Sequence, residues 1–308
     1  MQRSTAMQFG LLALVWGSSF LFVKIALSEM LPGQVVFARL VIGALTLMLL
    51  AVWRRPRLPQ TLAGWGHLVI LGALWCAVPF NLFAWAQQQV ASSLASILNA
   101  TTPLMTAVAA WLLLRERAGA SRWVGLVLGV VGVVVIVEPW RGGVGGTVWG
   151  QLGCLGATAC YGLGFAYYRR FVVPLQLSAL ATALVQVGSA AVLASLALPF
   201  SGWYAAVPSW PVWGALLALG ALGTGAAYVW NANVANAWGP TRASTVTYLI
   251  PVVGVLLGVL LLAEPLSWAE PIGGLVVLTG VAVVQGRWSL RSLLASRVDV
   301  GPTRRDDE

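Results

Sequence analysis

The sequence contains few charged residues, and acidic residues are half as numerous as basic ones. Of 308 residues only 9% are charged, nine of them Asp or Glu, whereas soluble proteins carry about 25% charged residues. Hydrophobic residues make up 59% of the chain. A soluble domain of this size cannot bury so much apolar surface, but a lipid bilayer accepts it. The composition therefore excludes an ordinary soluble protein and indicates a membrane protein.

The residues that most often build catalytic and metal sites are also scarce. There is one histidine, His67, and the three cysteines show no CxxC spacing. No pair of carboxylates lies inside an apolar run, so an aspartyl mechanism is excluded. A disulfide framework, a zinc site and a bound cofactor are not indicated. An intramembrane enzyme using Ser18 or Ser19 with Lys24 stays as an alternative of another class, although that spacing turns the side chains apart on a helix.

Long apolar runs are abundant, and their lengths of about 17–25 residues suit membrane-spanning helices rather than barrel strands. The expected fold is an all-α integral membrane protein with ten transmembrane helices. The first run continues past Lys24 without a small-x-small site, which argues against a cleaved signal peptide. The runs lie near 7–28, 34–53, 65–88, 91–114, 121–138, 147–169, 178–200, 210–235, 241–263 and 268–286.

The positive charges lie on one side of the predicted membrane. If the N-terminus is cytoplasmic, the opposite loops hold only Arg141. This asymmetry predicts cytoplasmic N- and C-termini in the inner (plasma) membrane, and it explains the net charge of +9 without nucleic acid. The fifteen arginines on the cytoplasmic side are Arg3, Arg54, Arg55, Arg57, Arg115, Arg117, Arg122, Arg169, Arg170, Arg242, Arg287, Arg291, Arg297, Arg304 and Arg305.

One stretch of the sequence is repeated 148 residues later. Ala95-Ser96, Pro103, Leu112-Leu113-Leu114 and Glu116 recur as Ala243-Ser244, Pro251, Leu260-Leu261-Leu262 and Glu264. Downstream, Gly125 and Gly132 recur as Gly273 and Gly280. A repeated register of this length indicates two copies of one structural unit.

The repeat predicts the domain organisation. Each unit holds five spans, an odd number, so the second unit must enter the membrane from the opposite side. We expect a first repeat over residues 1–142, an inverted second repeat over 143–286 and a charged cytoplasmic tail over 287–308. The glycine-rich segment from Arg141 to Thr147 is the expected seam.

Two motifs resemble those of a known family. Trp16-Gly17-Ser18-Ser19-Phe20 with Lys24 is similar to the opening of EamA-type carriers of the drug/metabolite transporter superfamily, and Glu264-x-Leu266-Ser267 with Gly273 and Gly280 resembles their closing motif. The first-half counterpart, Glu116, lacks the Leu-Ser pair. The resemblance implies a ten-helix carrier with a central cavity between its halves. Bacterial members, YddG-like aromatic amino acid exporters among them, export amino acids, and plastid relatives exchange sugar phosphates.

Helical spacing predicts which side chains face such a cavity. Polar residues and paired aromatic residues recur on one face of several spans in both halves, and polar side chains avoid lipid. An alternative for any single Asn, Ser or Thr is a bond between helices. The expected substrate-binding residues are Trp16, Phe20, Lys24, Asn81, Trp85, Asn99, Tyr161, Phe165, Asn233 and Tyr248.

Two basic residues and two prolines lie inside the predicted spans, and their positions predict specific roles. Lys24 and Arg39 are candidates to meet a substrate carboxylate or phosphate. Otherwise Lys24 extends to the outer headgroups and Arg39 caps carbonyl groups of a neighbouring helix. Pro103 and Pro251 each remove a helix hydrogen bond and are expected to act as hinges or helix breaks.

These observations predict a membrane transporter, an exporter of small metabolites, rather than an enzyme. Amino acids or related carboxylate-bearing compounds are the expected substrates, moved by alternating access. Because no acid is placed inside a span, we expect facilitated diffusion or exchange without a dedicated proton site. Multidrug efflux and a channel are the alternatives. The expected partners are a small-molecule substrate and the lipid bilayer; the oligomeric state is undetermined, one copy being sufficient.

Overall fold

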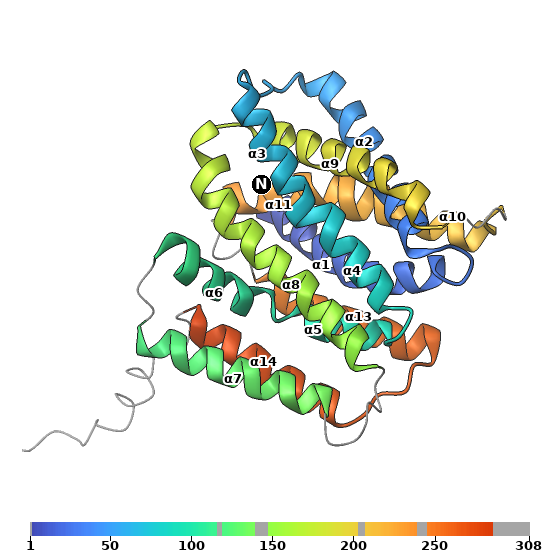
Figure 1. Cartoon of the computed structure of the whole chain (residues 1–308), viewed down its shortest axis with the longest axis vertical. Helices are drawn as coiled ribbons and strands as arrows, with labels where there is room; N and C mark the ends of the chain where they lie inside the picture. Colours follow the sequence, from blue (N-terminus) through green and yellow to red (C-terminus); the bar gives the residue numbers. More distant parts are fainter. Residues whose placement is uncertain (1, 116–118, 139–146, 203–206, 239–244, 286–308) are drawn as a thin grey trace, which may run out of the picture.

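The computed structural model describes residues 2–115, 119–138, 147–202, 207–238 and 245–285, and throughout these ranges the regular structure is helical (Figure 1). Several sequence features lie outside them. These are Glu116 with Arg117, the seam at 141–146, Arg242 to Ser244 and the tail at 287–308.

The first half of the chain forms five helical stretches. They are α1 (Gln2–Ala26), α2 (Pro32–Arg54), a third stretch, a fourth made of α5 (Ser92–Asn99) and α6 (Thr102–Leu114), and α7 (Ala120–Val137). The third stretch begins as α3 (Leu62–Gly72), passes through the π-helical turn η1 (Ala73–Ala77) and ends as α4 (Val78–Ala86).

The second half follows the same plan. It contains α8 (Val148–Tyr167), extended by η3 (Tyr168–Val172) and η4 (Val173–Leu175), and then α9 (Ala179–Ala197) with η5 (Leu198–Phe200). The next stretch joins α10 (Trp210–Leu217), the π-helical η6 (Ala218–Ala226) and α11 (Ala227–Trp238), and the half ends with α13 (Val246–Leu262) and α14 (Ala269–Val284). The π-helical turns η1 and η6 therefore interrupt corresponding stretches.

Each expected apolar run coincides with helix where the structure describes it. Within those ranges, seven helical stretches are long and apolar enough to cross a membrane, and α13 and α14 are shorter apolar helices. The helix α8, rich in glycine and alanine, is not among the seven. The all-helical class and several spans are confirmed, and the full set of ten spans stays a prediction.

Short polar residues begin several of these helices. The hydroxyl groups of Thr61, Thr147 and Ser178 accept hydrogen bonds of 3.1, 3.1 and 3.2 Å from the backbone N–H three residues later. Such caps satisfy N–H groups that have no partner inside the helix. The helix starts were therefore predictable from sequence to within a few residues.

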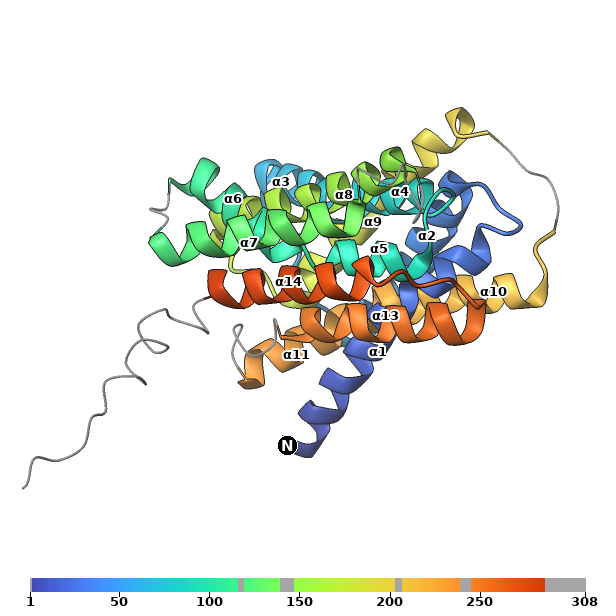
Figure 2. The same cartoon turned by 90° about the horizontal axis from the view of Figure 1, so that it is seen from below.

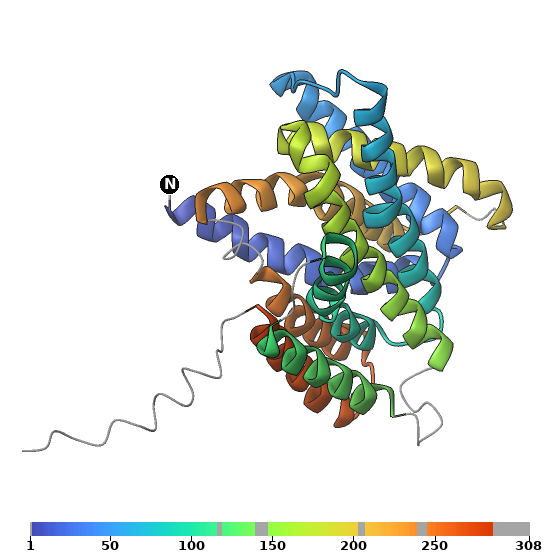
Figure 3. The same ribbon diagram turned by 60° about the vertical axis from the view of Figure 1, so that its left-hand side comes forward.

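The first helix of each half packs against the other half. Helix α1 contacts α13, α11 and α10, while α8 contacts α6, α4 and α5; Figure 3 shows α1 and α11 running side by side. A Cβ atom on Gly17 of α1 would lie 2.5 Å from Val253 Cβ, and one on Gly162 of α8 would lie 2.5 Å from the Met105 carbonyl carbon. Met105 and Val253 are 148 positions apart (253 − 105), and Gly17 and Gly162 are 145 apart (162 − 17), so the two contacts join similarly placed residues of the two halves.

Helices α7 and α14 lie side by side in both Figure 1 and Figure 2, and glycines set their separation. A Cβ atom on Gly125 would lie 2.6 Å from the Gly280 carbonyl oxygen, and one on Gly132 would lie 2.7 Å from the Gly273 carbonyl oxygen. Small residues let helix backbones approach in this way. The pairing runs in opposite order along the two helices, so these equivalent helices are antiparallel.

Candidate functional site

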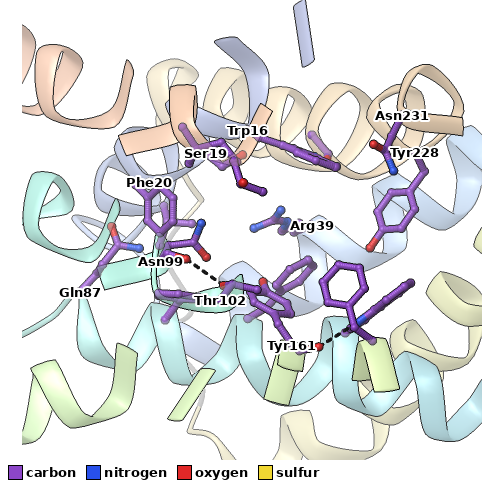
Figure 4. Close-up of a pocket in the computed structure, with 18 residues that line it drawn as sticks. Trp16, Ser19, Phe20, Arg39, Gln87, Asn99, Thr102, Tyr161, Tyr228 and Asn231 are labelled. Carbon is purple, nitrogen blue, oxygen red and sulfur yellow. Dashed lines mark hydrogen bonds between the residues drawn. The ribbon is translucent and has the colours of Figure 1, made fainter. Parts of the chain in front are cut away.

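A cavity of about 220 Å³ lies between the two halves of the bundle (Figure 4). Helices α1, α2, α4 and α5 of the first half line it together with α8, α11 and α13 of the second. Eight aromatic side chains form most of the wall: Trp16, Phe20, Trp75, Phe80, Phe83, Tyr161, Phe165 and Tyr228. The polar lining residues are Ser19, Arg39, Gln87, Asn99, Thr102, Asn231 and Thr247.

The aromatic wall is held together by contacts between rings. Trp75 and Phe165 meet edge to face with centroids 4.7 Å apart, and Phe20 meets Phe83 in the same manner at 5.4 Å. The indole N–H of Trp16 donates to the Gly223 carbonyl at 3.2 Å, which ties α1 to η6. Because each ring is fixed by a neighbour, the wall presents a preformed apolar surface to a ligand.

Arg39 supplies the positive charge of the cavity. Its guanidinium carbon lies 3.7 Å from the centroid of the Phe80 ring, and its Nε donates to Thr224 Oγ1 at 3.1 Å. The Thr224 hydroxyl donates in turn to the Leu219 carbonyl at 3.0 Å, so it must accept from Arg39. Figure 4 shows the Arg39 side chain in the space enclosed by the labelled residues. No lining residue, all of which the structure describes, is acidic.

Amide side chains add uncharged polar groups. Within the described part of the chain, the side-chain amides of Asn99 and Asn231 have no protein hydrogen-bond partner. Gln87 is fully buried, and neither its amide nitrogen nor its amide oxygen is bonded to a described residue. The unbonded amides of Asn99 and Asn231 are therefore available to a polar ligand, whereas the amide atoms of Gln87 are buried behind the cavity wall.

Five of the ten residues expected to bind substrate line this cavity: Trp16, Phe20, Asn99, Tyr161 and Phe165. The other five lie elsewhere. Asn81 donates to the Ala77 carbonyl of its own helix at 2.8 Å, and Trp85 packs against Gly153. Asn233 is exposed and donates to the side chain of Gln8 at 3.2 Å, and the Tyr248 hydroxyl donates to Gln285 at 2.8 Å.

Lys24 lies outside the cavity and bonds to a turn instead. Its Nζ donates to the carbonyl oxygens of Gln87 and Val90 at 2.6 and 3.0 Å, at the end of α4. From the sequence, Lys24 was expected to contact the substrate or the outer headgroups. In the structure its ammonium group instead contacts backbone carbonyl groups. A cation near a helix C-terminus stabilises the unpaired carbonyl groups there.

Glu264 holds the other side of the same turn. Its two carboxylate oxygens accept hydrogen bonds from the backbone N–H groups of Ser92 and Ser93 at 2.7 and 2.9 Å, at the start of α5. Burial acts to raise the pKa of Glu264, but the hydrogen bonds from Ser93 and Ser92 outweigh it and lower that pKa below its usual value. Lys24 on α1 and Glu264 in the segment after α13 therefore hold residues 87–93 from different halves of the chain.

The two prolines lie in different surroundings. Pro103 occupies the first turn of α6, directly after the break between α5 and α6 at residues 100 and 101. Pro251 is buried inside α13, which continues through it. The expected helix break therefore occurs beside Pro103, whereas at Pro251 the structure contradicts it. A proline at the sixth position of a helix loses one hydrogen bond, and the close packing of α13 on α1 and α5 keeps the helix intact.

Two further acids, at the ends of α7 and α14, are buried. Glu138, the C-cap of α7, and Glu270, in the first turn of α14, are 8% and 3% exposed. One oxygen of Glu270 has no hydrogen-bond partner among the described residues. Neither acid lines the cavity.

Comparison with known proteins decides the family. The model of the EamA-like transporter family matches residues 4–138 and 148–285, which together are most of the chain. The chain belongs to the EamA-like transporter family. The resemblance inferred from the motifs is confirmed.

The relatives of this EamA-like chain are transporters by name. It is 26% identical over 286 residues to the uncharacterized inner membrane transporter YedA of Escherichia coli K12, covering 90% of this chain and 89% of the relative. It is 23% identical over 305 residues to the probable amino-acid metabolite efflux pump of Salmonella typhimurium, covering 89% and 92%. A solved crystal structure matches with a TM-score of 0.64 at 21% identity, covering 97% of this chain and 99% of the other, which shows a shared fold.

These comparisons and the apolar helices together identify a multi-pass inner-membrane transporter of the EamA-like family. The family and the names of the relatives indicate transport rather than catalysis.

Proposed function

We propose that this EamA-like protein exports small metabolites, amino acids or related carboxylate-bearing compounds, by alternating access between two inverted five-helix repeats. The observation that carries the proposal is the position of the cavity. Its wall is shared by both halves, so a relative movement of the halves changes access to it from either side.

The helix contacts support the inverted arrangement. Gly17 in the first half contacts Val253 in the second, and Gly162 in the second half contacts Met105 in the first. Each half thus contributes the same kind of contact to the other. The antiparallel pairing of α7 with α14 is the relation that inversion of equivalent helices produces. If each half has five spans, the arginine distribution favours a cytoplasmic position for both termini.

The lining supports the substrate class. Aromatic rings surround unbonded amide groups and one guanidinium group, with no acidic residue among the lining residues. A positive cavity disfavours lipophilic cations, so the lining argues against multidrug efflux of cationic compounds. The Salmonella relative is named as an amino-acid metabolite efflux pump, which agrees with this class.

Counterflow in proteoliposomes tests the proposal. Vesicles loaded with one unlabelled amino acid at a time should accumulate the same labelled amino acid for at least one member of the set. Asn99→Val removes an unbonded cavity amide and should lower the counterflow rate about tenfold, whereas Asn233→Val, the same change outside the cavity, should leave the rate unchanged. Absence of counterflow across all amino acids and across carboxylates without an amino group, such as 3-phenylpropionate, would refute the proposal, as would equal losses in both variants.

A further inference from the structure

A buried guanidinium group without an acidic partner is unusual inside a membrane protein. Arg39 lies two turns into the span α2 (Pro32–Arg54), and within the described residues its side-chain contacts are Thr224 and the Phe80 ring. Both contacts are uncharged. Charged groups within spans are otherwise paired with one another or with backbone carbonyl groups, and they mark substrate pathways.

The two contacts leave one edge of the guanidinium open. Nε is occupied by Thr224, and one face is covered by the Phe80 ring. The remaining donors are the N–H groups of Nη1 and Nη2, which form a planar two-pronged edge. This edge matches the two oxygens of a carboxylate, which it binds with two parallel charge-assisted hydrogen bonds.

Close packing fixes the position of Arg39. A Cβ atom on Gly220 would lie 2.9 Å from the Arg39 carbonyl oxygen, and one on Gly43 would lie 2.8 Å from Thr224 Cγ2. Helix α2 and η6 therefore meet at backbone distance, directly beside the hydrogen bond between Arg39 and Thr224. A donor that is positioned in advance loses little freedom when a ligand binds.

The cavity has no matching site for an ammonium group. Its lining, all within the described ranges, offers neutral oxygen atoms such as those of Asn99 and Asn231, and no carboxylate. An ammonium group in this cavity would face the positive charge of Arg39. Aromatic faces also attract ammonium groups, but an attraction of about 0.5–2 kcal/mol does not replace a carboxylate partner, and the Phe80 face is already taken by Arg39.

We infer that the cavity recognises aryl or alkyl carboxylates through Arg39, and that an α-ammonium group on the substrate is not required for binding. The eight aromatic lining residues hold the apolar part of the ligand, and the open edge of Arg39 holds the carboxylate. The inference rests on the proposed function, because it assigns the ligand of the same cavity. A single guanidinium group suits a monoanion better than a phosphate dianion, which needs more positive charge.

Isothermal titration of the purified wild-type protein with four compounds that share a phenyl group tests whether the cavity recognises a carboxylate, an ammonium or a phosphate group. They are 3-phenylpropionate (carboxylate alone), L-phenylalanine (carboxylate and ammonium), 2-phenylethylamine (ammonium alone) and phenyl phosphate. We expect 3-phenylpropionate to bind within about threefold of L-phenylalanine or more tightly. The amine and the phosphate should bind at least about tenfold more weakly than 3-phenylpropionate.

Substitutions then assign the effect to Arg39. Arg39→Gln should weaken 3-phenylpropionate binding about 10- to 100-fold, and it should leave amine binding the same or make it tighter because a repelling positive charge is removed. Arg39→Lys keeps the charge but loses the two-pronged edge, so an intermediate loss is expected. Arg54→Gln removes a charge from the exposed end of the same helix and should have no effect.

The results that would overturn the inference are distinct from those that would overturn the proposed function. The inference is wrong if the amine or the phosphate binds as tightly as 3-phenylpropionate, if L-phenylalanine binds more than about tenfold more tightly, or if Arg39→Gln behaves like Arg54→Gln. It is also wrong if none of the four compounds binds while counterflow of another amino acid succeeds, in which case the transport proposal stands. The wild-type series and Arg39→Lys decide the question even if Arg39→Gln does not fold.

Discussion

Replacing Glu264 by Gln should loosen the turn between α4 and α5. The Glu264 carboxylate accepts the backbone N–H groups of Ser92 and Ser93, the first two residues of α5. N–H groups in the first turn of a helix have no partner inside the helix. Gly258 of α13 provides the space, because a Cβ atom there would lie 2.5 Å from Glu264 Oε2. A glutamine offers one neutral acceptor oxygen in place of two charged ones.

The magnitude follows from these two bonds. A hydrogen bond to a charged group contributes about 1.5–3 kcal/mol, and Glu264 is half-buried, so solvent screening favours the lower end. We expect Glu264→Gln to cost about 1.5 kcal/mol, equivalent to about tenfold faster exchange at the two amides when the turn opens locally. For a chain of 308 residues, the midpoint of thermal unfolding should fall by about 2 °C.

The contribution of Glu264 to the stability of the folded protein should decrease at low pH. Because the pKa of Glu264 is lowered in the folded protein, its contribution to stability is complete above the ordinary pKa of a glutamate. The contribution is lost as the pH falls toward the lower folded-state value. The wild-type protein should therefore lose stability on acidification below about pH 4.5, and Glu264→Gln should lose correspondingly less.

Hydrogen exchange followed by mass spectrometry, on peptides covering residues 90–96, measures the effect. Glu29→Gln is the matched control, because Glu29 accepts one backbone N–H, that of Ser209, in an exposed loop. The control should leave exchange at Ser92 and Ser93 unchanged. Unchanged exchange there in Glu264→Gln, or an equal change in the control, would show that the carboxylate does not hold the turn.

Three further predictions concern the bundle, the driving force and the topology. Gly132→Ala should destabilise the protein by about 1–3 kcal/mol in thermal unfolding, because the new methyl group meets the backbone of α14, whereas Gly188→Ala, with open space around it, should not destabilise it. Transport into liposomes should proceed without an imposed pH gradient; strong accumulation driven by the gradient alone and abolished by Glu138→Gln would show that a proton site exists. Cysteines added singly at the two termini should react with an impermeant thiol reagent only from the cytoplasmic side, and labelling of either terminus from outside would overturn the topology.

The sequence predicted the helices well because local apolar patterns determine them. The first helix of each half is continuous, and Trp16, Phe20, Tyr161 and Phe165 on these helices all line the cavity. A regular rotation of 100° per residue is a good description there.

The same reasoning failed where helices depart from regular geometry. Asn81 and Trp85 follow the π-helical turn η1, and Asn233 follows η6. A π-helical turn contains an extra residue and therefore rotates every later side chain relative to a regular helical wheel. In the second half Tyr228 and Asn231 line the cavity in place of Asn233.

The cations were hard to distinguish for another reason. Lys24 and Arg39 both occupy spans, and their different roles depend on partners far along the chain: the turn at Gln87 for Lys24, and Thr224 for Arg39. No local pattern encodes such a partner. That no acid of the described residues contacts Arg39 becomes visible only when the neighbouring helices are placed.

The packing of α1 has a consequence for the order in which the protein is made. Gly17 meets Val253, a residue 236 positions later (253 − 17). At about 5–20 residues per second, the ribosome needs roughly 12–47 s to reach that residue after Gly17. During this time α1 is already synthesised, while the helix that covers Gly17 does not yet exist. The surface of α1 around Gly17 is therefore exposed to lipid or to an insertion factor until translation of the second half is nearly complete.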